Sequence, residues 1–137
     1  MNTNGKSFLV LMIVTAFTAL VLRFAVSQII TLTITQNEST AAGILKMIGT
    51  ALENYAGDNK NVFPGSIKAL TETNPPYLNR DYIAESPLRG YNYTCSRLEP
   101  AGFSCSAAPI KCNLTGKKIF IVSTGNIFVS EDCFKKE

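Results

Sequence analysis

Four cysteines, all in the last third of the chain, carry the clearest chemistry in this sequence: Cys95, Cys105, Cys112 and Cys133. An even number of cysteines in a small domain that follows an apolar N-terminal segment is typical of disulfides in an oxidising compartment. Zinc is the competing interpretation, but no pair has the C-x-x-C spacing and the sequence contains no histidine. We therefore predict two disulfides.

The sequence around Pro100 favours one pairing of these cysteines. The segment YTCSRLEPAGFSCSA is nearly symmetric about Pro100, which would set Cys95 opposite Cys105 in a hairpin. Cys112 would then pair with Cys133 and close a second, C-terminal hairpin. Four cysteines allow three pairings, so the connectivity stays open at this point.

Residues that could form an active site are scarce. The lack of histidine removes the commonest general base and rules out Ser-His-Asp and Cys-His arrangements. Neither of the glycine-rich motifs that bind phosphates occurs, and the neighbouring carboxylates Glu131 and Asp132 are interpreted as a solvated turn. We expect no enzyme activity, no cofactor and no metal.

The charge of the chain gives little support to nucleic-acid binding. The formal net charge is +3, but Lys6 and Arg23 lie in the N-terminal segment, and the rest of the chain has 11 basic and 10 acidic residues, which leaves +1. A basic cluster near the C-terminus is interpreted as a solvated face; it contains Lys111, Lys117, Lys118, Lys135 and Lys136.

The N-terminal part of the chain has the composition of a membrane-spanning helix. Phe8 to Leu22 is apolar apart from two threonines, and Arg23 is the only charge between Ser7 and Asn37. A helix needs about 20 mostly apolar residues to cross the hydrocarbon core, and Phe8 to Leu32 is long enough. A cleaved secretory signal fits less well because no A-x-A site follows Leu22. A buried soluble helix fits less well because nothing else in the chain could wrap it.

The helical pattern continues past this segment without a break, so we predict one helix over residues 7–56. Its second half is amphipathic, with apolar residues at steps of three and four. These are Ala41, Ile44, Leu45, Ile48, Ala51, Leu52 and Tyr55. The residues Gly57-Asp58-Asn59 favour a C-cap and turn, and Ser66 to Thr71 could form a single helical turn.

From Gly90 the pattern becomes that of short strands. GYNYTC and GFSCSA predict one antiparallel pair, and residues 118–122 and 126–129 predict another, joined around Thr124-Gly125. The amphipathic half of the helix is the available cover for their apolar faces. The expected class is therefore α+β, with a long N-terminal helix whose second half packs on a small C-terminal antiparallel sheet.

These features, taken in order, resemble type IV pilins and type II secretion pseudopilins. The resemblance rests on a short leader that ends in glycine, an apolar helix that becomes amphipathic, the segment TALENYAGDNKNVFP, and the later PPYL, GYNY and GKKIFIVSTGNIF. It implies a leader of residues 1–5 that a prepilin peptidase removes between Gly5 and Lys6. It further implies a membrane or filament-core half helix (6–36) and a globular domain (37–137).

The resemblance also implies how such a subunit would assemble. The N-terminal helix would pack on other pilin or pseudopilin subunits, and would lie in inner-membrane lipid before assembly. The globular domain would face the periplasm, or the outside of the cell in a finished filament. The helix residues expected to make these contacts are Phe8, Leu9, Val10, Leu11, Ile13, Phe17, Leu20 and Phe24.

The sequence departs from the family pattern at four places. Val10 stands where the family usually has a glutamate, Lys6 replaces a phenylalanine, and Ser27 replaces the helix proline. Arg23 lies where the family is apolar, and should either reach the membrane surface or find a partner. The late loop that binds calcium in major pseudopilins offers only Glu85 here, so calcium is not expected.

Three functional hypotheses follow. The first is a structural minor pilin or pseudopilin that assembles through its N-terminal helix. The second is an uncleaved, single-pass membrane protein whose pilin-like periplasmic domain is a binding module. The third is a competence pilin that binds DNA through the C-terminal lysines, which is the weakest because Glu131, Asp132 and Glu137 lie among those lysines.

Overall fold

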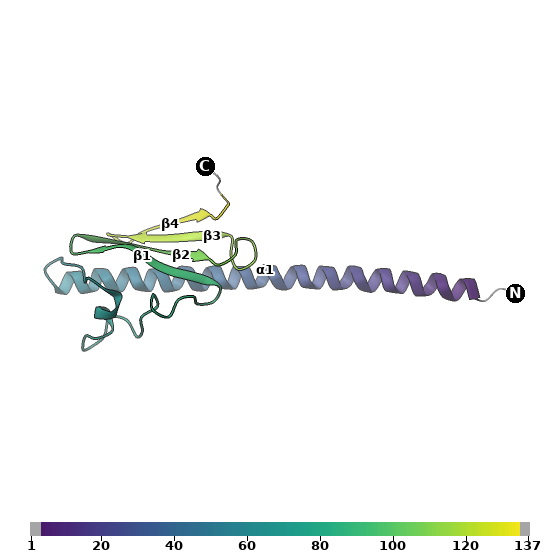
Figure 1. Cartoon of the computed structure of the whole chain (residues 1–137), viewed down its shortest axis with the longest axis horizontal. Coiled ribbons are helices and arrows are strands. Elements are labelled where there is room, and N and C mark those ends of the chain that lie inside the picture. The colour runs from purple at the N-terminus through teal and green to yellow at the C-terminus, as the bar shows by residue number, and fades with distance from the viewer. Residues whose placement is uncertain (1–3, 135–137) are drawn as a thin grey trace. The chain divides into compact units, whose positions relative to one another are not determined.

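The structure is a computed structural model that describes residues 4–134, with side chains from Ser7 onward. It contains one long helix, α1 (Asn4–Asp58), a short 3-10 helix, η1 (Ile67–Leu70), and four strands (Figure 1). The strands are β1 (Tyr91–Glu99), β2 (Gly102–Pro109), β3 (Lys118–Ser123) and β4 (Ile127–Asp132). The chain divides into two compact units, of which the first ends at Thr33 and the second begins at Ile34.

The first unit is the apolar part of α1. Every side chain described from Ser7 to Thr33 is exposed within the chain. The threonine hydroxyls in this part bond to carbonyls of their own helix: Thr15 donates to Met12 O and Thr18 to Thr15 O, both at 2.9 Å. Such local bonds satisfy the hydroxyl groups without water, as a membrane helix requires.

The second unit is built around the amphipathic part of α1. Six of the seven apolar residues predicted for the inner face are buried, and only Tyr55 is half-buried. Leu45, Ile48 and Leu52 are completely buried, and Ile34 and Ala56 extend the face at its two ends. The three- and four-residue spacing in the sequence therefore identified the face of the helix that packs on the sheet.

α1 ends at Asp58, close to the predicted stop, but a different set of residues makes the turn. Gly57 keeps an ordinary helical conformation, whereas Lys60 and Asn61 have positive φ angles of 57° and 61°. Asn61 N donates to Ala56 O at 2.8 Å, and the Asn59 side chain donates to Tyr55 O at 2.8 Å. The chain thus reverses through two consecutive left-handed residues after the helix, and not through the glycine.

The four strands form a single antiparallel sheet in the order β1-β2-β3-β4. Both predicted hairpins are present, and β2 and β3 join them into one sheet. Two details of the prediction are wrong. Asn126, predicted to begin a strand, lies in the turn with a φ of 55°. The turn has three residues, and both Gly125 and Asn126 adopt left-handed conformations in it. Glu131 and Asp132 lie in β4 and not in a turn; exposed charges suit an edge strand.

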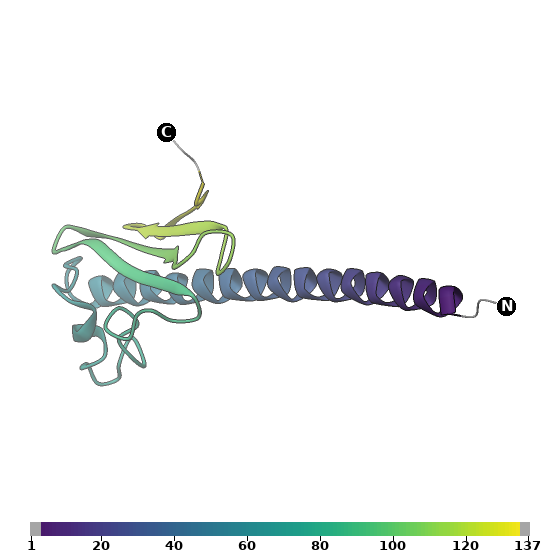
Figure 2. The same cartoon turned by 45° about the vertical axis from the view of Figure 1, so that its right-hand side comes forward.

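The core lies between the sheet and the inner face of α1 (Figures 1 and 2). Tyr91 and Tyr93 of β1 alternate with exposed Asn92 and Thr94, which is the pattern of a strand with one covered face. The segment from Asn59 to Gly90 lies along another side of the same helix and adds buried side chains. These are Phe63, Ile67, Leu70, Leu78 and Tyr82. The class is α+β, as the sequence predicted.

Gly49 lies where the backbone of α1 closely approaches the sheet. It is buried, and a β-carbon added to it would lie 2.8 Å from Cγ2 of Val122 and 2.9 Å from Oδ1 of Asn126. Separations this short would force the helix away from β3 and the turn that follows it. Glycine at this position therefore sets how closely the helix and the sheet pack.

We predict that Gly49→Ala lowers the free energy of unfolding by about 1–3 kcal/mol, because the added methyl group overpacks the contact with Val122. Gly43→Ala is the matched control, since a β-carbon there has no neighbour within 4 Å. It should stabilise the helix by up to about 1 kcal/mol through helix propensity alone. Urea unfolding of both variants measures this, and equal effects would contradict a close contact at Gly49.

Candidate functional site

The candidate site is the surface of the first unit of α1, which we call the apolar helix surface and define as residues 8–33. All eight residues predicted to make assembly contacts are on it, with 58–69% of their area exposed. Because Phe8 to Leu11 are consecutive, these side chains point to every side of the helix. The surface also includes residues the prediction left out: Met12, Val14, Val21, Leu22, Val26, Ile29, Ile30 and Leu32. The nearly continuous run of apolar residues in the sequence is the signal that could have identified them.

The described chain has no cover for this surface. α1 is long and apolar enough to cross a membrane, and the most apolar part of it has no residue buried inside the protein. A core helix of a soluble protein passes the same test of length, but its side chains would be mostly buried. The apolar helix surface is therefore suited to contact with lipid, with another helix, or with both in turn.

Two residues of this surface were singled out in the sequence. Val10, where the resemblance implies a glutamate, is exposed and apolar. Arg23 is exposed and forms no ion pair or hydrogen bond with any residue that the structure describes. The predicted cleavage residues Gly5 and Lys6 are within α1, and the side chain of Lys6 lies outside the described part of the chain.

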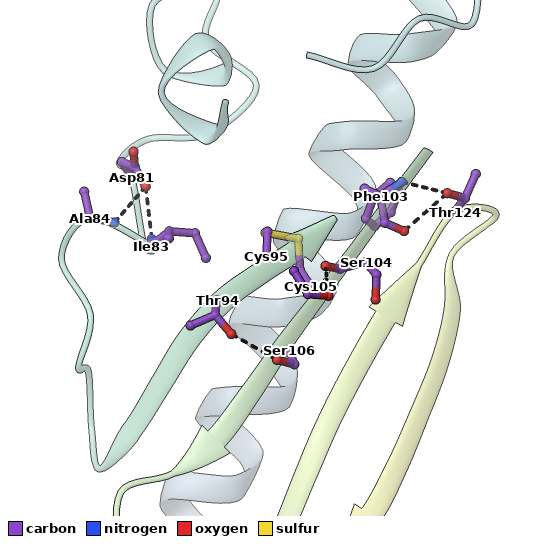
Figure 3. Close-up of a disulfide and its surroundings, with 11 residues drawn as sticks. Asp81, Ile83, Ala84, Thr94, Cys95, Phe103, Ser104, Cys105, Ser106 and Thr124 are labelled. Carbon is purple, nitrogen blue, oxygen red and sulfur yellow. Dashed lines mark hydrogen bonds between the residues drawn. A yellow bond between two sulfur atoms is a disulfide. The ribbon is translucent and has the colours of Figure 1, made fainter. Parts of the chain in front are cut away.

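The first disulfide joins neighbouring strands (Figure 3). Cys95 of β1 pairs with Cys105 of β2, its direct partner in the register, with 3.9 Å between the Cα atoms. Cys105 is completely buried, and a bulge follows Cys95 in β1. Thr94 and Ser106 form the next cross-strand pair, with their hydroxyl groups 3.2 Å apart. The bond thus fixes the register of the first hairpin.

The second disulfide closes the open end of the β3–β4 hairpin. Cys112 lies in the connection before β3 and Cys133 follows β4, with 6.0 Å between the Cα atoms. Cys133 N also donates to Lys117 O at 2.8 Å. Both pairs are those that the sequence favoured. Sequence symmetry identified the first pair, and the second followed from it.

We predict that the double variant Cys112→Ser/Cys133→Ser lowers the free energy of unfolding by about 3 kcal/mol. The disulfide closes a loop with a sequence separation of 21 and so restricts the conformational entropy of the unfolded chain. Urea unfolding of the variant and of the original chain, the latter with its disulfides intact and after reduction, measures the effect. Leu114→Ala, an exposed change in the same connection, is the control and should have little effect. A modifiable thiol at Cys112 in the native protein would contradict the pairing.

Two carboxylates of α1 bind the backbone at the two ends of β3. Glu38 Oε1 accepts a hydrogen bond from Lys117 N at 2.7 Å, and Glu53 Oε1 accepts one from Gly125 N at 2.5 Å. The step of 15 residues from Glu38 to Glu53 corresponds to about 22 Å of helix, and Lys117 to Gly125 corresponds to about 26 Å of strand. α1 and β3 therefore run side by side in the same direction, held at both ends.

Asn37 adds a third bond of this kind, because its side chain donates to Thr115 O at 3.0 Å. These contacts were not predicted. The only sequence signal for them was the position of Asn37, Glu38 and Glu53 at the margin of the apolar face. They satisfy backbone groups in the loops next to β3 that the sheet leaves unpaired.

Two buried tyrosines of β1 differ in their hydrogen bonding. Tyr91 Oη donates to Lys118 O at 2.8 Å, whereas Tyr93 Oη is buried and has no hydrogen-bond partner in the described chain. Burial raises the pKa of both side chains from 10.0 to about 12, and Glu38 adds to the effect at Tyr91. The folded protein therefore keeps both phenolic protons at pH values at which the unfolded chain loses them.

We predict that the contribution of Tyr91 and Tyr93 to stability is full below pH 10 and is lost between pH 10 and pH 12, because the unfolded state loses these protons first. Tyr93→Phe should stabilise the protein by about 1 kcal/mol by removing an unpaired buried hydroxyl, and Tyr91→Phe should destabilise it by about as much. Thermal unfolding at pH 7 and across the alkaline range measures this. Equal destabilisation by both variants would contradict the assignment of Tyr93.

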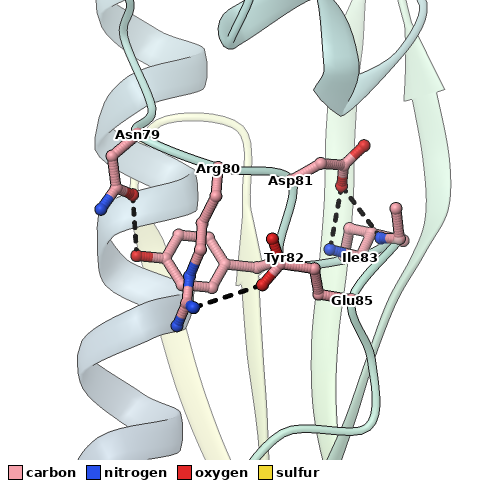
Figure 4. A network of polar contacts seen from close by, with 7 residues as sticks. Asn79, Arg80, Asp81, Tyr82, Ile83 and Glu85 are labelled. Atoms are coloured by element: carbon pink, nitrogen blue, oxygen red, sulfur yellow. Dashed lines mark hydrogen bonds and ion pairs between the residues drawn. The ribbon is translucent and has the colours of Figure 1, made fainter.

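The loop from Asn79 to Glu85 is closed by its own side chains (Figure 4). Asp81 Oδ1 accepts hydrogen bonds from Ile83 N and Ala84 N, both at 3.0 Å, and Arg80 pairs with Glu85 at 3.3 Å. The Arg80 guanidinium also lies 4.8 Å from the centre of the Tyr82 ring. Among the described residues there is no group of three or more His, Cys, Asp or Glu placed to hold a metal ion.

Two open grooves, with volumes of about 440 and 550 Å³, share Tyr77 as a lining residue. Their walls come from the second half of α1 and from the loop 73–79. Tyr77 Oη donates to Asp58 at 2.6 Å, which raises the pKa of Tyr77, and its ring packs edge-on against Tyr55. The side chain that lines both grooves is thus held in place.

No family model, curated protein or solved structure matches this chain. Its class is therefore defined by its own architecture. It is an α+β protein in which one helix is long and apolar enough to span a membrane, and in which the second part of that helix packs on a four-stranded antiparallel sheet with two disulfides.

Proposed function

We propose that the protein is a pilin-like structural subunit, a minor pilin or pseudopilin, of a type IV pilus or type II secretion filament. The observation that carries the proposal is the single helix α1, which is exposed and apolar on all sides up to Thr33 and packs on a disulfide-linked sheet from Ile34 onward. In this proposal residues 6–36 form the membrane and filament-core segment, and residues 37–137 form the periplasmic domain.

The proposed partners follow from this arrangement. The apolar helix surface is stable in inner-membrane lipid before assembly and against the helices of other pilin or pseudopilin subunits afterwards. The two disulfides suit an oxidising compartment such as the periplasm. A prepilin peptidase would remove residues 1–5 and release Lys6 as the new N-terminus.

The second candidate is an uncleaved, single-pass membrane protein with a periplasmic binding domain. It is favoured by the apolar Val10, which cannot neutralise the N-terminus of a neighbouring subunit, and by the grooves beside Tyr77, which offer a binding surface. Binding of DNA has less support. Lys118 lies opposite Asp132 in the β3–β4 register, which lowers the local positive charge, and Lys135 and Lys136 lie outside the described residues.

The intact mass of the protein from membranes, with and without the prepilin peptidase, tests the proposal. We predict a chain that begins at Lys6 when the peptidase is present, with a mass lower by four hydrogens because of two disulfides. Gly5→Leu should block cleavage, whereas Ser7→Ala should not. A chain that keeps Met1 while another prepilin in the same cells is processed would exclude the filament proposal and leave the membrane-anchored binding protein.

A further inference from the structure

Arg23 must lie inside the membrane if α1 spans it. The stretch before it, Phe8 to Leu22, has 15 residues and is about 22 Å long as a helix. The stretch after it, Phe24 to Thr35, has 12 residues and is about 18 Å long. The hydrocarbon core is about 30 Å thick, so neither stretch can cross it alone. Every spanning position of the helix therefore includes Arg23.

Helix geometry makes lipid phosphate a poor partner for this guanidinium. With Phe8 at one boundary of the core, the Arg23 Cα lies about 8 Å inside the other boundary; with Thr35 at that other boundary, it has passed the centre and lies about 12 Å inside the first. Side chains on a helix tilt toward its N-terminus. The Arg23 side chain therefore points away from the nearer boundary in the first of these positions, and in the last it still has about 12 Å of hydrocarbon core between its Cα and the boundary that it points to.

A second copy of this chain is also a poor partner. The sequence has no acidic residue before Glu38, so two copies in register would place Arg23 beside Arg23. A shift of 15 residues, about 22 Å, would be needed to bring Glu38 of one copy to Arg23 of another. Glu38 Oε1 also accepts a hydrogen bond from Lys117 N at 2.7 Å, which holds this carboxylate beside β3 of its own chain. The missing negative charge must come from a different chain.

We propose that the apolar helix surface docks a membrane helix of another protein that carries one Asp or Glu at the depth of Arg23. The planar guanidinium binds a carboxylate through two parallel hydrogen bonds, and such a pair removes the cost of an isolated charge in the membrane. Ala19 and Ser27 lie one turn from Arg23 on the same face, and small residues there let a second helix come close. This inference rests on the membrane placement in the proposed function and names the partner of that same surface.

The test uses the full chain in phosphatidylcholine vesicles with a labelled leucine–alanine helix as the probe. The three probes differ at one position only. This position is matched in depth to Arg23 and carries Glu, Gln or Leu. Fluorescence energy transfer between the protein and each probe measures how tightly the two associate. Flotation with the vesicles shows that each variant inserts, and Arg23→Leu should insert at least as well as the original chain because it is more apolar.

We predict that the Glu probe associates with the protein about tenfold more tightly than the Leu probe, with the Gln probe between them. Arg23→Leu should abolish this preference, and Arg23→Lys should keep part of it because lysine is a point charge without the planar fork. Gln28→Leu is the matched control. It removes a polar side chain on nearly the opposite side of the helix and should leave the preference unchanged.

Two results would overturn the inference. Equal association of the Glu and Leu probes would mean that Arg23 is satisfied by lipid phosphate. Stronger energy transfer between two labelled copies of this chain than between the chain and the Glu probe would mean that a second copy is the partner. The probe experiment does not depend on leader cleavage. If the protein prefers the Glu probe but keeps Met1 in cells, the filament proposal is excluded and the inference about Arg23 stands.

Discussion

The packing of the inner face of α1 against the antiparallel sheet is the contact on which the rest of the structure depends. A small four-stranded sheet with one apolar face needs a cover, and the described chain provides a single long helix for it. Leu45, Ile48 and Leu52 are completely buried in this contact. Gly49 allows the helix backbone to come close to Val122 at this point of the contact. The grooves beside Tyr77 are formed by the same helix on a different side.

Directional contacts add a fixed register to this non-directional packing. Glu38 and Glu53 bind backbone amides at opposite ends of β3, and the disulfides fix the first hairpin and close the second. Apolar burial alone would tolerate small shifts of the helix along the sheet, whereas a hydrogen bond at each end of one strand does not. A domain of this size gains stability from disulfides because its core is small.

One helix thus serves two environments. From Ile34 onward its apolar residues follow a stripe that the sheet covers, and before that point they occupy every side. Arg23 is the exception within the apolar part, and its charge sets a condition on whatever surrounds it. Lipid alone can accept the leucines, valines and phenylalanines of this surface, but the guanidinium requires a polar partner at a defined depth. The combination of an all-round apolar surface with one charge is the feature of this helix on which the proposed assembly rests.

The sequence by itself determined the features that depend on local or periodic patterns. It predicted the long helix and its inner face from spacing, the two hairpins from alternation and turn residues, and both disulfide pairs from the near-symmetry around Pro100. It also identified Arg23 as the one charge in the apolar segment. Tertiary structure decided the features that join residues far apart in the chain. Among these are the pairing of β2 with β3, the extension of β4 through Asp132, the bonds of Glu38 and Glu53, and the contact at Gly49. Spacing of three and four residues shows which side of a helix is apolar, but not which loop its marginal carboxylates will meet. That depends on where the completed sheet places its backbone amides, and no local pattern specifies it.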